Sequence, residues 1–224
     1  MNALLVCCLL GGYLSTARAT GQWQLVKSDE KNNINIYYRT LADENIEFRG
    51  ETTVKASLSS FIALFLDLDS MSKWVYRTQQ VKMLQRIGAT ELYIYTVHNM
   101  PIPFRDRDSV NIVRLSQRTA TKAVIIKVHD AQDYLDPNPD YVRVKRAVSQ
   151  WQLVPLGDGE VQVIFSGYGE PGGNISSATF RSVLFQWLVK KFLWQVPHKT
   201  LLGLKQRINR EQYQQQVFEF IAEP

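Results

Sequence analysis

The sequence is short of the residues that most enzymes and metalloproteins use for chemistry. It has only two cysteines, Cys7 and Cys8, and three histidines that are far apart along the chain. Neither the H-E-x-x-H motif of zinc proteases nor the G-x-S-x-G motif of serine hydrolases occurs in it. We therefore expect no metal site and no cofactor, and we predict that the protein is not an enzyme.

A long hydrophobic run and a strong excess of one charge are also lacking. The longest mainly apolar stretch of the body, residues 183–196, contains two lysines and two glutamines, whereas a spanning helix needs about 20 apolar residues. Lys and Arg number 26 against 21 Asp and Glu, which gives a net charge of +5 without a basic run. We therefore expect contact with a membrane only at its surface, and no binding of nucleic acid.

The N-terminal residues form an apolar segment of a different kind. Residues 3–10 are continuously apolar, and Ala17-Arg18-Ala19 has the small-x-small form of a signal-peptidase site. We predict a secretory signal peptide over residues 1–19 and a single domain over residues 20–224. Cleavage would remove both cysteines, which suits an oxidising compartment such as the bacterial periplasm. The alternatives are a misassigned start or a buried N-terminal strand.

Most of the remaining chain has the alternation and the turn residues of short strands. Strands are predicted at residues 34–39, 46–54, 81–87, 91–98, 108–115, 123–128, 141–154 and 161–167. One helix interrupts them, where Leu58, Phe61, Ile62 and Phe65 recur at helical spacing. The other breaks are turns, and the Asp-Gly within residues 157–159 is a strong hairpin signal. Since no further helices separate the strands, the sheet should be antiparallel.

The C-terminal part is helical in pattern from about residue 176 to residue 216. A proline, Pro197, should kink this helix. Residues 183–196 are too apolar for a helix with one buried face, so they need apolar surroundings or a cavity that holds an apolar ligand. The glycine pattern at residues 167–172 resembles a nucleotide-binding loop. No second strand follows it, so we interpret it as a turn that leads from the sheet into the helix.

Five short segments, in this order, resemble those of START (steroidogenic acute regulatory protein-related lipid transfer) domains. They are Pro101-Ile102-Pro103-Phe104-Arg105-Asp106-Arg107-Asp108, Tyr141-Val142-Arg143, Glu170-Pro171-Gly172-Gly173-Asn174-Ile175, Trp187-Leu188-Val189, and Val196-Pro197 with Thr200-Leu201-Leu202. The likeness covers about residues 23–208. The sequence departs from the family by roughly eight extra residues between Gly173 and Val183.

This resemblance implies an α+β helix-grip fold, in which a curved antiparallel sheet wraps a long C-terminal helix around an internal apolar cavity. It implies a protein without a cofactor that holds one lipid or other hydrophobic ligand and carries it across an aqueous compartment. Such a protein would touch membranes transiently, and we expect a monomer. Two alternatives stay open: a lipid-sensing or partner-binding module without transfer, and a cyclase-type enzyme on the same fold.

Candidate ligand-binding residues follow from the predicted strands and helix. They are Tyr95, Arg107, Asn111, Arg143, Trp187, Leu188 and Phe192. Each of the two arginines has two interpretations: an ion pair at a strand start, which for Arg107 would involve Asp108, or a cavity-wall charge that meets a buried acid or a ligand head group. Asn111 either faces the cavity or lies on a half-exposed sheet.

The loop before residue 107 is the candidate gate of the cavity. It consists of Met100, Pro101, Ile102, Pro103 and Phe104, which are apolar although they lie between strands. Basic residues on the terminal helix could hold the protein against anionic lipid, with roughly 1 kcal/mol from each. Alternatively, these basic residues form an ordinary solvated helix face.

Overall fold

The computed structural model describes residues 21–43, 45–102, 104–170 and 194–224. The predicted signal peptide, Pro103 of the gate and residues 176–193 of the predicted terminal helix lie outside these ranges. Three of the predicted ligand-binding residues, Trp187, Leu188 and Phe192, therefore lie outside the described residues as well.

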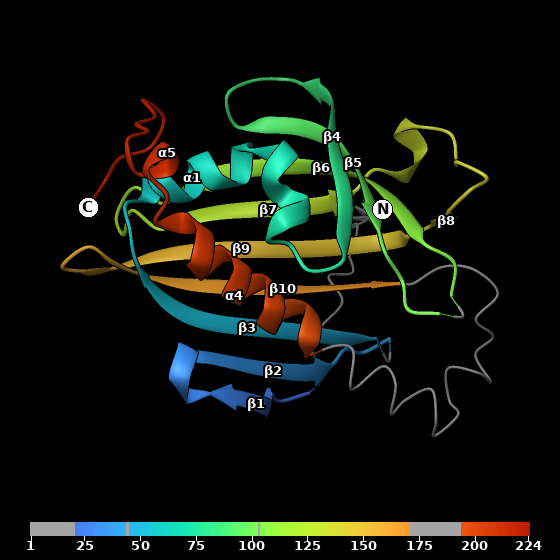
Figure 1. Ribbon diagram of the computed structural model, residues 1–224, viewed down its shortest axis with the longest axis horizontal. Coiled ribbons are helices and arrows are strands. Elements are labelled where there is room, and N and C mark those ends of the chain that lie inside the picture. The colour runs from blue at the N-terminus through green and yellow to red at the C-terminus, as the bar shows by residue number, and fades with distance from the viewer. Residues whose placement is uncertain (1–20, 44, 103, 171–193) are drawn as a thin grey trace, which may run out of the picture.

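A ten-stranded sheet, strongly curved, forms the frame of the described chain (Figure 1). Its strands are β1 (Gln24–Asp29), β2 (Ile34–Thr40), β3 (Ile46–Lys55), β4 (Thr78–Arg86), β5 (Glu91–His98), β6 (Arg107–Gln117), β7 (Val124–Asp130), β8 (Val142–Arg143), β9 (Lys145–Gly157) and β10 (Glu160–Glu170). Their order is β1-β2-β3-β10-β9-β7-β6-β5-β4, and β8 pairs with β6. All neighbours along this order are antiparallel, as predicted, whereas the short β8 pair is parallel.

The helices lie on the concave face of the sheet (Figure 1). They are α1 (Leu58–Leu66), the 3-10 helix η2 (Leu68–Lys73), α4 (Gln195–Ile208) and α5 (Glu211–Gln214), and two further 3-10 helices, η1 (Glu30–Asn32) and η3 (Gln132–Tyr134), lie in connections. A curved, mainly antiparallel sheet with helices on its concave face confirms the predicted α+β helix-grip fold. None of the described helices is long and apolar enough to cross a membrane.

Three local predictions need correction. The predicted strand at residues 141–154 is divided into β8 and β9, and Arg146 at the start of β9 has a left-handed φ of 50°. Strand β1 was not predicted because it is a solvent-exposed edge strand without apolar alternation. The terminal helix does not continue to residue 216, because α4 ends at Ile208 and Arg210 is extended.

Pro197 does not interrupt α4. It lies in the first turn of the helix, which begins at Gln195. A proline is tolerated there because the backbone N–H groups of the first turn have no carbonyl partner within the helix. Residues 171–193 lie outside the described ranges, so a kink between α4 and the chain before it stays a prediction.

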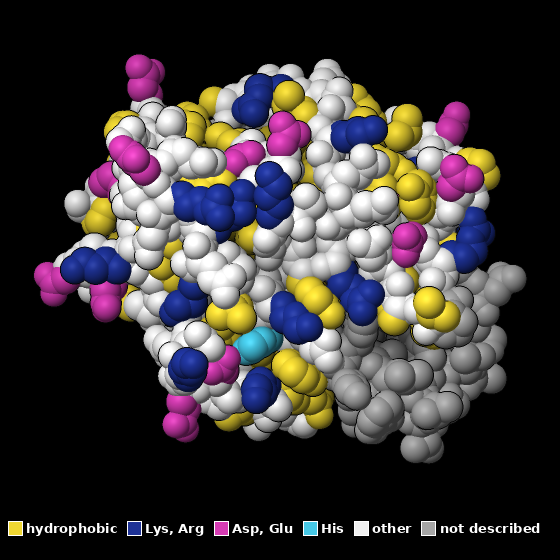
Figure 2. All heavy atoms as spheres, in the orientation of Figure 1, with side chains coloured by type: hydrophobic (Ala, Val, Ile, Leu, Met, Phe, Trp, Pro, Cys, Tyr) yellow, Lys and Arg dark blue, Asp and Glu magenta, His cyan; other side chains and the backbone are white. Residues whose placement is uncertain are grey.

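Two glycines bring α4 into close contact with the rest of the protein. A Cβ atom on Gly50 of β3 would lie 2.8 Å from Leu201 and 3.0 Å from Pro197. A Cβ atom on Gly203 of α4 would lie 2.5 Å from the carbonyl oxygen of Trp74, just after η2. At Gly50 the backbone of β3 thus touches side chains of α4, and at Gly203 the backbone of α4 touches the backbone after η2. These two contacts fix α4 between β3 and η2. Lys and Arg side chains gather over and beside α4 on the surface (Figure 2).

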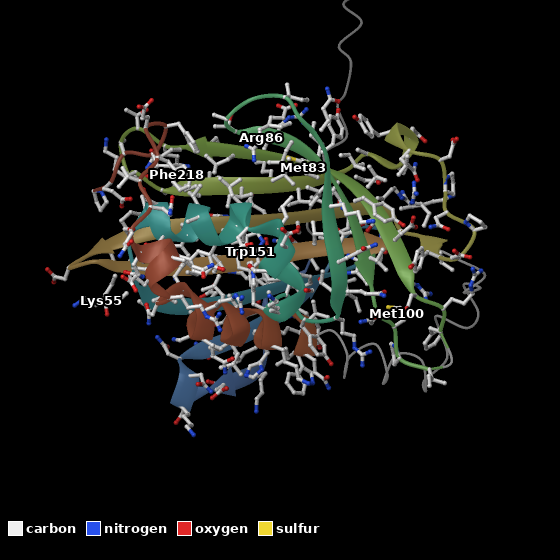
Figure 3. All side chains as sticks on the ribbon, turned by 45° about the horizontal axis from the view of Figure 1, so that its top comes forward. Lys55, Met83, Arg86, Met100, Trp151 and Phe218 are labelled. Carbon is white, nitrogen blue, oxygen red and sulfur yellow. The ribbon has the colours of Figure 1, made fainter. Side chains whose placement is uncertain are left out.

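The C-terminal segment crosses the beginning of α1 and caps it. Ser57 accepts a hydrogen bond from the Ser60 N–H at 3.1 Å. The two carboxylate oxygens of Glu223 accept hydrogen bonds from the N–H groups of Leu58 and Ser59, at 2.9 and 2.8 Å. Three N–H groups that the helix itself leaves without a partner are thus satisfied. Phe218 lies at the same end of the molecule, whereas Met100 lies at the opposite end (Figure 3).

Replacing Glu223 by alanine tests this cap. The Glu223→Ala variant should lower the free energy of unfolding by about 1–2 kcal/mol, because two helix N–H groups lose a charged acceptor. Urea denaturation of the variant measures this change. Glu219→Ala is the matched control, since Glu219 is an exposed carboxylate of the same segment. An equal loss in both variants would contradict a specific role of Glu223.

Candidate functional site

A cavity of about 410 Å³ lies between the concave face of the sheet and the helices. Its described walls come from α1, η2, the beginning of α4, strands β3 to β7, β9 and β10, and the connections between them. Most of the wall is apolar, with side chains such as Ile62, Leu66, Leu92, Val113 and Ile126. A volume of this size lies in the range of roughly 300–1,000 Å³ that is typical of small-molecule sites.

Aromatic rings form the centre of the cavity wall. Trp151 of β9 stacks on Phe165 of β10, with ring centroids 4.0 Å apart. Phe65 of α1 meets the ring of Trp151 edge-on at 4.9 Å, and Trp74 meets Phe65 edge-on at 5.5 Å. The helix and the sheet thus touch through rings whose positions fix one another.

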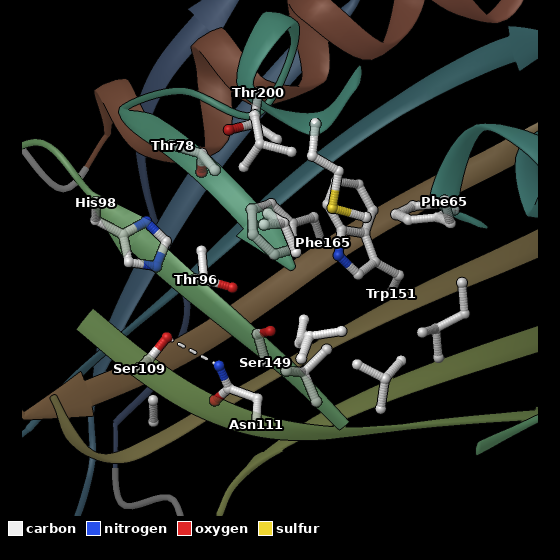
Figure 4. Close-up of a pocket in the computed structure, with 18 of the residues that line it drawn as sticks. Phe65, Thr78, Thr96, His98, Ser109, Asn111, Ser149, Trp151, Phe165 and Thr200 are labelled. Carbon is white, nitrogen blue, oxygen red and sulfur yellow. Dashed lines mark hydrogen bonds between the residues drawn. The ribbon is translucent and has the colours of Figure 1, made fainter. Parts of the chain in front are cut away.

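One end of the cavity, away from the Trp151 and Phe65 rings, is polar. Strand pairing places Thr78 of β4 opposite His98 of β5, and His98 opposite Arg107 of β6. One step further into the sheet, Thr96 lies opposite Ser109. Residues directly opposite each other point to the same face of a sheet, and all five line the cavity. Figure 4 shows His98, Thr96 and Ser109 on one side of the cavity and Phe65 and Trp151 on the other.

Burial sets the charge state of this polar end. It lowers the pKa of His98 from 6.5 to about 4, so the imidazole is neutral near pH 7. Burial also lowers the pKa of Arg107, which still stays charged because an arginine begins above 12. The guanidinium is 4% exposed, donates a hydrogen bond to the carbonyl oxygen of Arg105, and lies 5.8 Å from the ring centroid of Phe104.

Two polar atoms of the cavity wall lack a hydrogen-bond partner within the described chain. They are the hydroxyl oxygen of Thr78 and the indole nitrogen of Trp74. Both side chains are about 95% buried, and an unsatisfied buried donor costs about 1–3 kcal/mol. A ligand that hydrogen-bonds to these atoms would recover this cost.

Two of the predicted ligand-binding residues, Arg107 and Asn111, line the cavity. They lie on one face of β6 together with Ser109, whose hydroxyl accepts a hydrogen bond from the Asn111 amide at 2.9 Å. Our sequence reasoning missed Ser109, although the i, i+2 spacing of the three residues is the signal that would have found it. It also missed Thr96 and His98, which have the same spacing on β5.

The placement of Tyr95 at the cavity was wrong by one residue of strand register. Leu92, Ile94, Thr96 and His98 of β5 face the cavity, so Tyr95 points to the outer face of the sheet. There it packs with Val97 and Val110 in a small separate core, and burial together with the charge of Asp108 raises its pKa to about 12.

Arg143 lies outside the cavity wall and has a structural role. Its guanidinium binds both carboxylate oxygens of Asp108, at 3.1 and 2.9 Å. It also donates to the carbonyl oxygens of Gln132, Leu135 and Asp136, which holds the loop before β8. The proposed ion pair between Arg107 and Asp108 was therefore wrong: successive strand residues point to opposite faces, and Asp108 pairs with Arg143 instead.

The predicted gate connects β5 to β6 beside the polar end. Met100 lines the cavity, and its N–H donates to the Asp106 carboxylate at 2.8 Å. Pro101 is half-buried and accepts a hydrogen bond from the Phe104 N–H at 2.9 Å, whereas Ile102 is 96% exposed. A large apolar side chain thus projects into solvent next to the cavity. Whether these residues act as a gate stays a prediction.

No group of three or more His, Cys, Asp or Glu that could hold a metal ion occurs among residues 21–43, 45–102, 104–170 and 194–224.

The low pKa of His98 predicts a pH dependence of stability. Between pH 6.5 and about 4 the unfolded chain binds a proton at His98 and the folded protein does not, so stability should fall as the pH falls through this window. The difference in unfolding free energy between pH 6.5 and pH 5 should be smaller in His98→Gln, as measured in urea. An equal pH dependence in both proteins would show that His98 titrates normally.

Comparison with known proteins agrees with the fold. A family model of the START domain matches residues 8–194. The crystal structure of a STAR-related lipid transfer protein fragment from Xanthomonas axonopodis is 28% identical and superposes with a TM-score of 0.72, covering 84% of this chain and 99% of that chain. Human StAR-related lipid transfer protein 5 has the same fold, with 16% identity, a TM-score of 0.68, and coverage of 85% and 88%.

A protein of Pseudomonas aeruginosa whose function is uncharacterised is also similar. It is 29% identical over 184 residues, which are 82% of this chain and 85% of the relative. The match to the family model spans far more than half of the sequence. The chain described here therefore belongs to the START domain family.

Proposed function

We propose that the protein takes up one hydrophobic ligand in the cavity and carries it across an aqueous compartment without changing it chemically. The cavity itself is the observation that carries this proposal. Its wall is mainly apolar, it has room for a small amphiphile, and its polar groups gather at one end. The START family typically binds lipids, and the Xanthomonas relative is named a lipid transfer protein.

The hydrophobic effect explains why such a carrier is useful. Each CH₂ group that leaves a bilayer for water costs about 0.8 kcal/mol, so a chain of sixteen carbons faces on the order of 13 kcal/mol. An apolar cavity takes the place of the bilayer as solvent for the chain. The barrier to moving the ligand through water then falls to the smaller cost of opening the protein.

The surface beside the cavity supports transient contact with a membrane. Ile102 projects from the loop between β5 and β6, and Lys199 is exposed near the beginning of α4, beside Tyr76 of the cavity wall. The Lys199 ammonium lies 4.6 Å from the ring centroid of Tyr76, which connects this helix turn to the cavity. An exposed apolar loop tip and an exposed basic group, both next to the cavity, suit a bilayer surface with anionic lipid.

The loop between β5 and β6 is better suited to open than α4. Gly50 and Gly203 fix α4 against β3 and η2 at contact distance, and Leu201 and Leu204 are fully buried. The loop, in contrast, is held mainly at its two ends, by the hydrogen bonds from Asn99 to the Arg77 carbonyl and from Met100 to Asp106, while Ile102 at its tip is 96% exposed. Segments with few buried contacts are the ones that open most easily.

The predicted signal peptide would direct the protein out of the cytoplasm. We therefore propose that this carrier works in the bacterial periplasm.

Filling the cavity tests the proposal directly. Ser149 of β9 points into the cavity (Figure 4), so Ser149→Trp should occupy space that the ligand needs. We expect transfer of a fluorescent lipid between donor and acceptor vesicles to fall at least about tenfold, while the thermal unfolding temperature stays close to that of the wild type. Mass spectrometry of organic extracts would show the loss of the ligand bound during expression.

The matched control is Gln152→Trp, which places the same ring on the same strand but outside the cavity wall. It should transfer lipid normally. Equal transfer by Ser149→Trp and the wild type would exclude the cavity as the carrier site. Ligand bound by the wild type without any transfer between vesicles would instead indicate a lipid sensor.

The exposed loop generates a second prediction. Ile102→Asp should slow transfer several-fold without releasing bound ligand, because a charge at the loop tip resists insertion into a bilayer. Val217→Asp is the control, since Val217 is 84% exposed and precedes Phe218 at the other end of the molecule. If both variants transfer at the wild-type rate, the loop does not contact the membrane.

A further inference from the structure

The polarity of the cavity changes along its length in a way that limits the ligand. At the end beside the loop between β5 and β6, the wall presents Thr78, Thr96, His98, Arg107 and Ser109. Further along the same strands it presents Val81, Ile94, Leu92, Val113 and Leu115. An occupant that matches this wall has one polar group and one apolar body, and its polar group lies beside the loop.

The charge of the wall is also one-sided. Among the described lining residues, arginine is the only charged type, as Arg77 and Arg107, and no aspartate or glutamate occurs. Of the two acids next to Arg107 in sequence, Asp106 accepts the N–H of Met100 and also stabilises the charge of Arg107, whereas Asp108 binds Arg143 on the opposite face of the sheet. The polar end therefore favours a negative group over a positive one.

We propose that the ligand is a single-chain amphiphile with an anionic head group, a carboxylate or a phosphate monoester, bound with that group at Arg107. This rests on the proposed function, since it names the class of ligand that the cavity holds. The hydrocarbon chain extends from Arg107 past Asn111 towards Trp151 and the apolar end. A cavity of about 410 Å³ lies in the lower part of the range for small-molecule sites, which suits one chain better than two.

The chemistry of the polar end fits an oxyanion. A guanidinium presents two parallel N–H donors to a carboxylate or phosphate, and such charge-assisted hydrogen bonds are about twice as strong as neutral ones. Thr78 and Ser109, which have short side chains, add neutral hydroxyl donors on the cavity face of the sheet. The hydroxyl of Thr78 is buried without a hydrogen-bond partner within the described chain, so an oxyanion there would give it one.

Tryptophan fluorescence provides the measurement, because Trp74 and Trp151 line the cavity. A brominated fatty acid bound there should quench these indoles. Palmitate, hexadecyl phosphate and hexadecanol, which share one chain length, are then compared as competitors above neutral pH. On the delipidated full chain, palmitate or hexadecyl phosphate should compete at least about tenfold better than hexadecanol, since the alcohol cannot use the charge of Arg107. The ratio between the two acids identifies which oxyanion the site prefers.

Arg107→Gln removes the charge and should abolish the preference for the acids, with little effect on hexadecanol. The matched control is Arg105→Gln, which removes the same charge from an exposed side chain two residues away and should keep the preference. If Arg107→Gln does not fold, Arg107→Lys takes its place. Lysine keeps the positive charge but lacks the planar guanidinium with two parallel N–H donors, so its preference for the acids over hexadecanol should be intermediate.

Equal competition by hexadecanol and the acids on the wild-type protein would overturn the proposal. A preference that persists in folded Arg107→Gln would overturn it too. Failure of the proposed function gives a different result, in which none of the three amphiphiles displaces the probe and no lipid moves between vesicles. Transfer of two-chain lipids with no binding of the acids would refute the ligand class and leave the carrier function intact.

Discussion

The close packing of α4 against the sheet determines which part of the interior is a packed core and which part is a cavity. Gly50 and Gly203 let the helix approach β3 and the residue after η2 at contact distance. Leu201, Leu204 and Ile208 then fill the space beneath it completely. Helix α4 thus covers the part of the concave face formed by β2, β3 and β10, whereas β4 contacts η2. The cavity is the space that remains between the helices and the sheet.

A hollow interior has a thermodynamic consequence. Wall atoms that face empty space lose dispersion contacts, so a protein with a cavity gives up stability that a filled core would have. The unpartnered polar atoms of Thr78 and Trp74 add to this loss. A ligand that fills the space and satisfies these atoms stabilises the folded state by mass action. Binding and folding are therefore linked in this molecule, and the proposed carrier should be most stable when loaded.

Neighbouring residues on β6 show how one strand serves two purposes. Asp108 points outward and, with Arg143, fixes the loop before β8. Arg107 and Ser109 point inward and supply charge and a hydroxyl group to the cavity. The outer pair is satisfied by bidentate hydrogen bonds and by three carbonyl contacts of Arg143, so its role is to hold the structure. The inner residues, together with His98 and Thr78, give the cavity its polar end and carry the inference about the ligand.

Local patterns in the sequence were enough to predict most of the fold. The helix after Ser57, the hairpin at residues 157–159 and the strand at residues 91–98 occur where the pattern placed them, because each depends on neighbouring residues alone. The START resemblance predicted the architecture. Only the tertiary structure decided which face of each strand lines the cavity, and it places Thr96 and His98 there instead of Tyr95. The physical reason is the two-residue period of a strand: both faces of β5 carry large apolar or aromatic side chains, Leu92 and Ile94 on one and Tyr93, Tyr95 and Val97 on the other, so its sequence alone cannot tell the inner face from the outer one. The partner of Asp108 was likewise settled only when folding brought Arg143 next to it from 35 residues away.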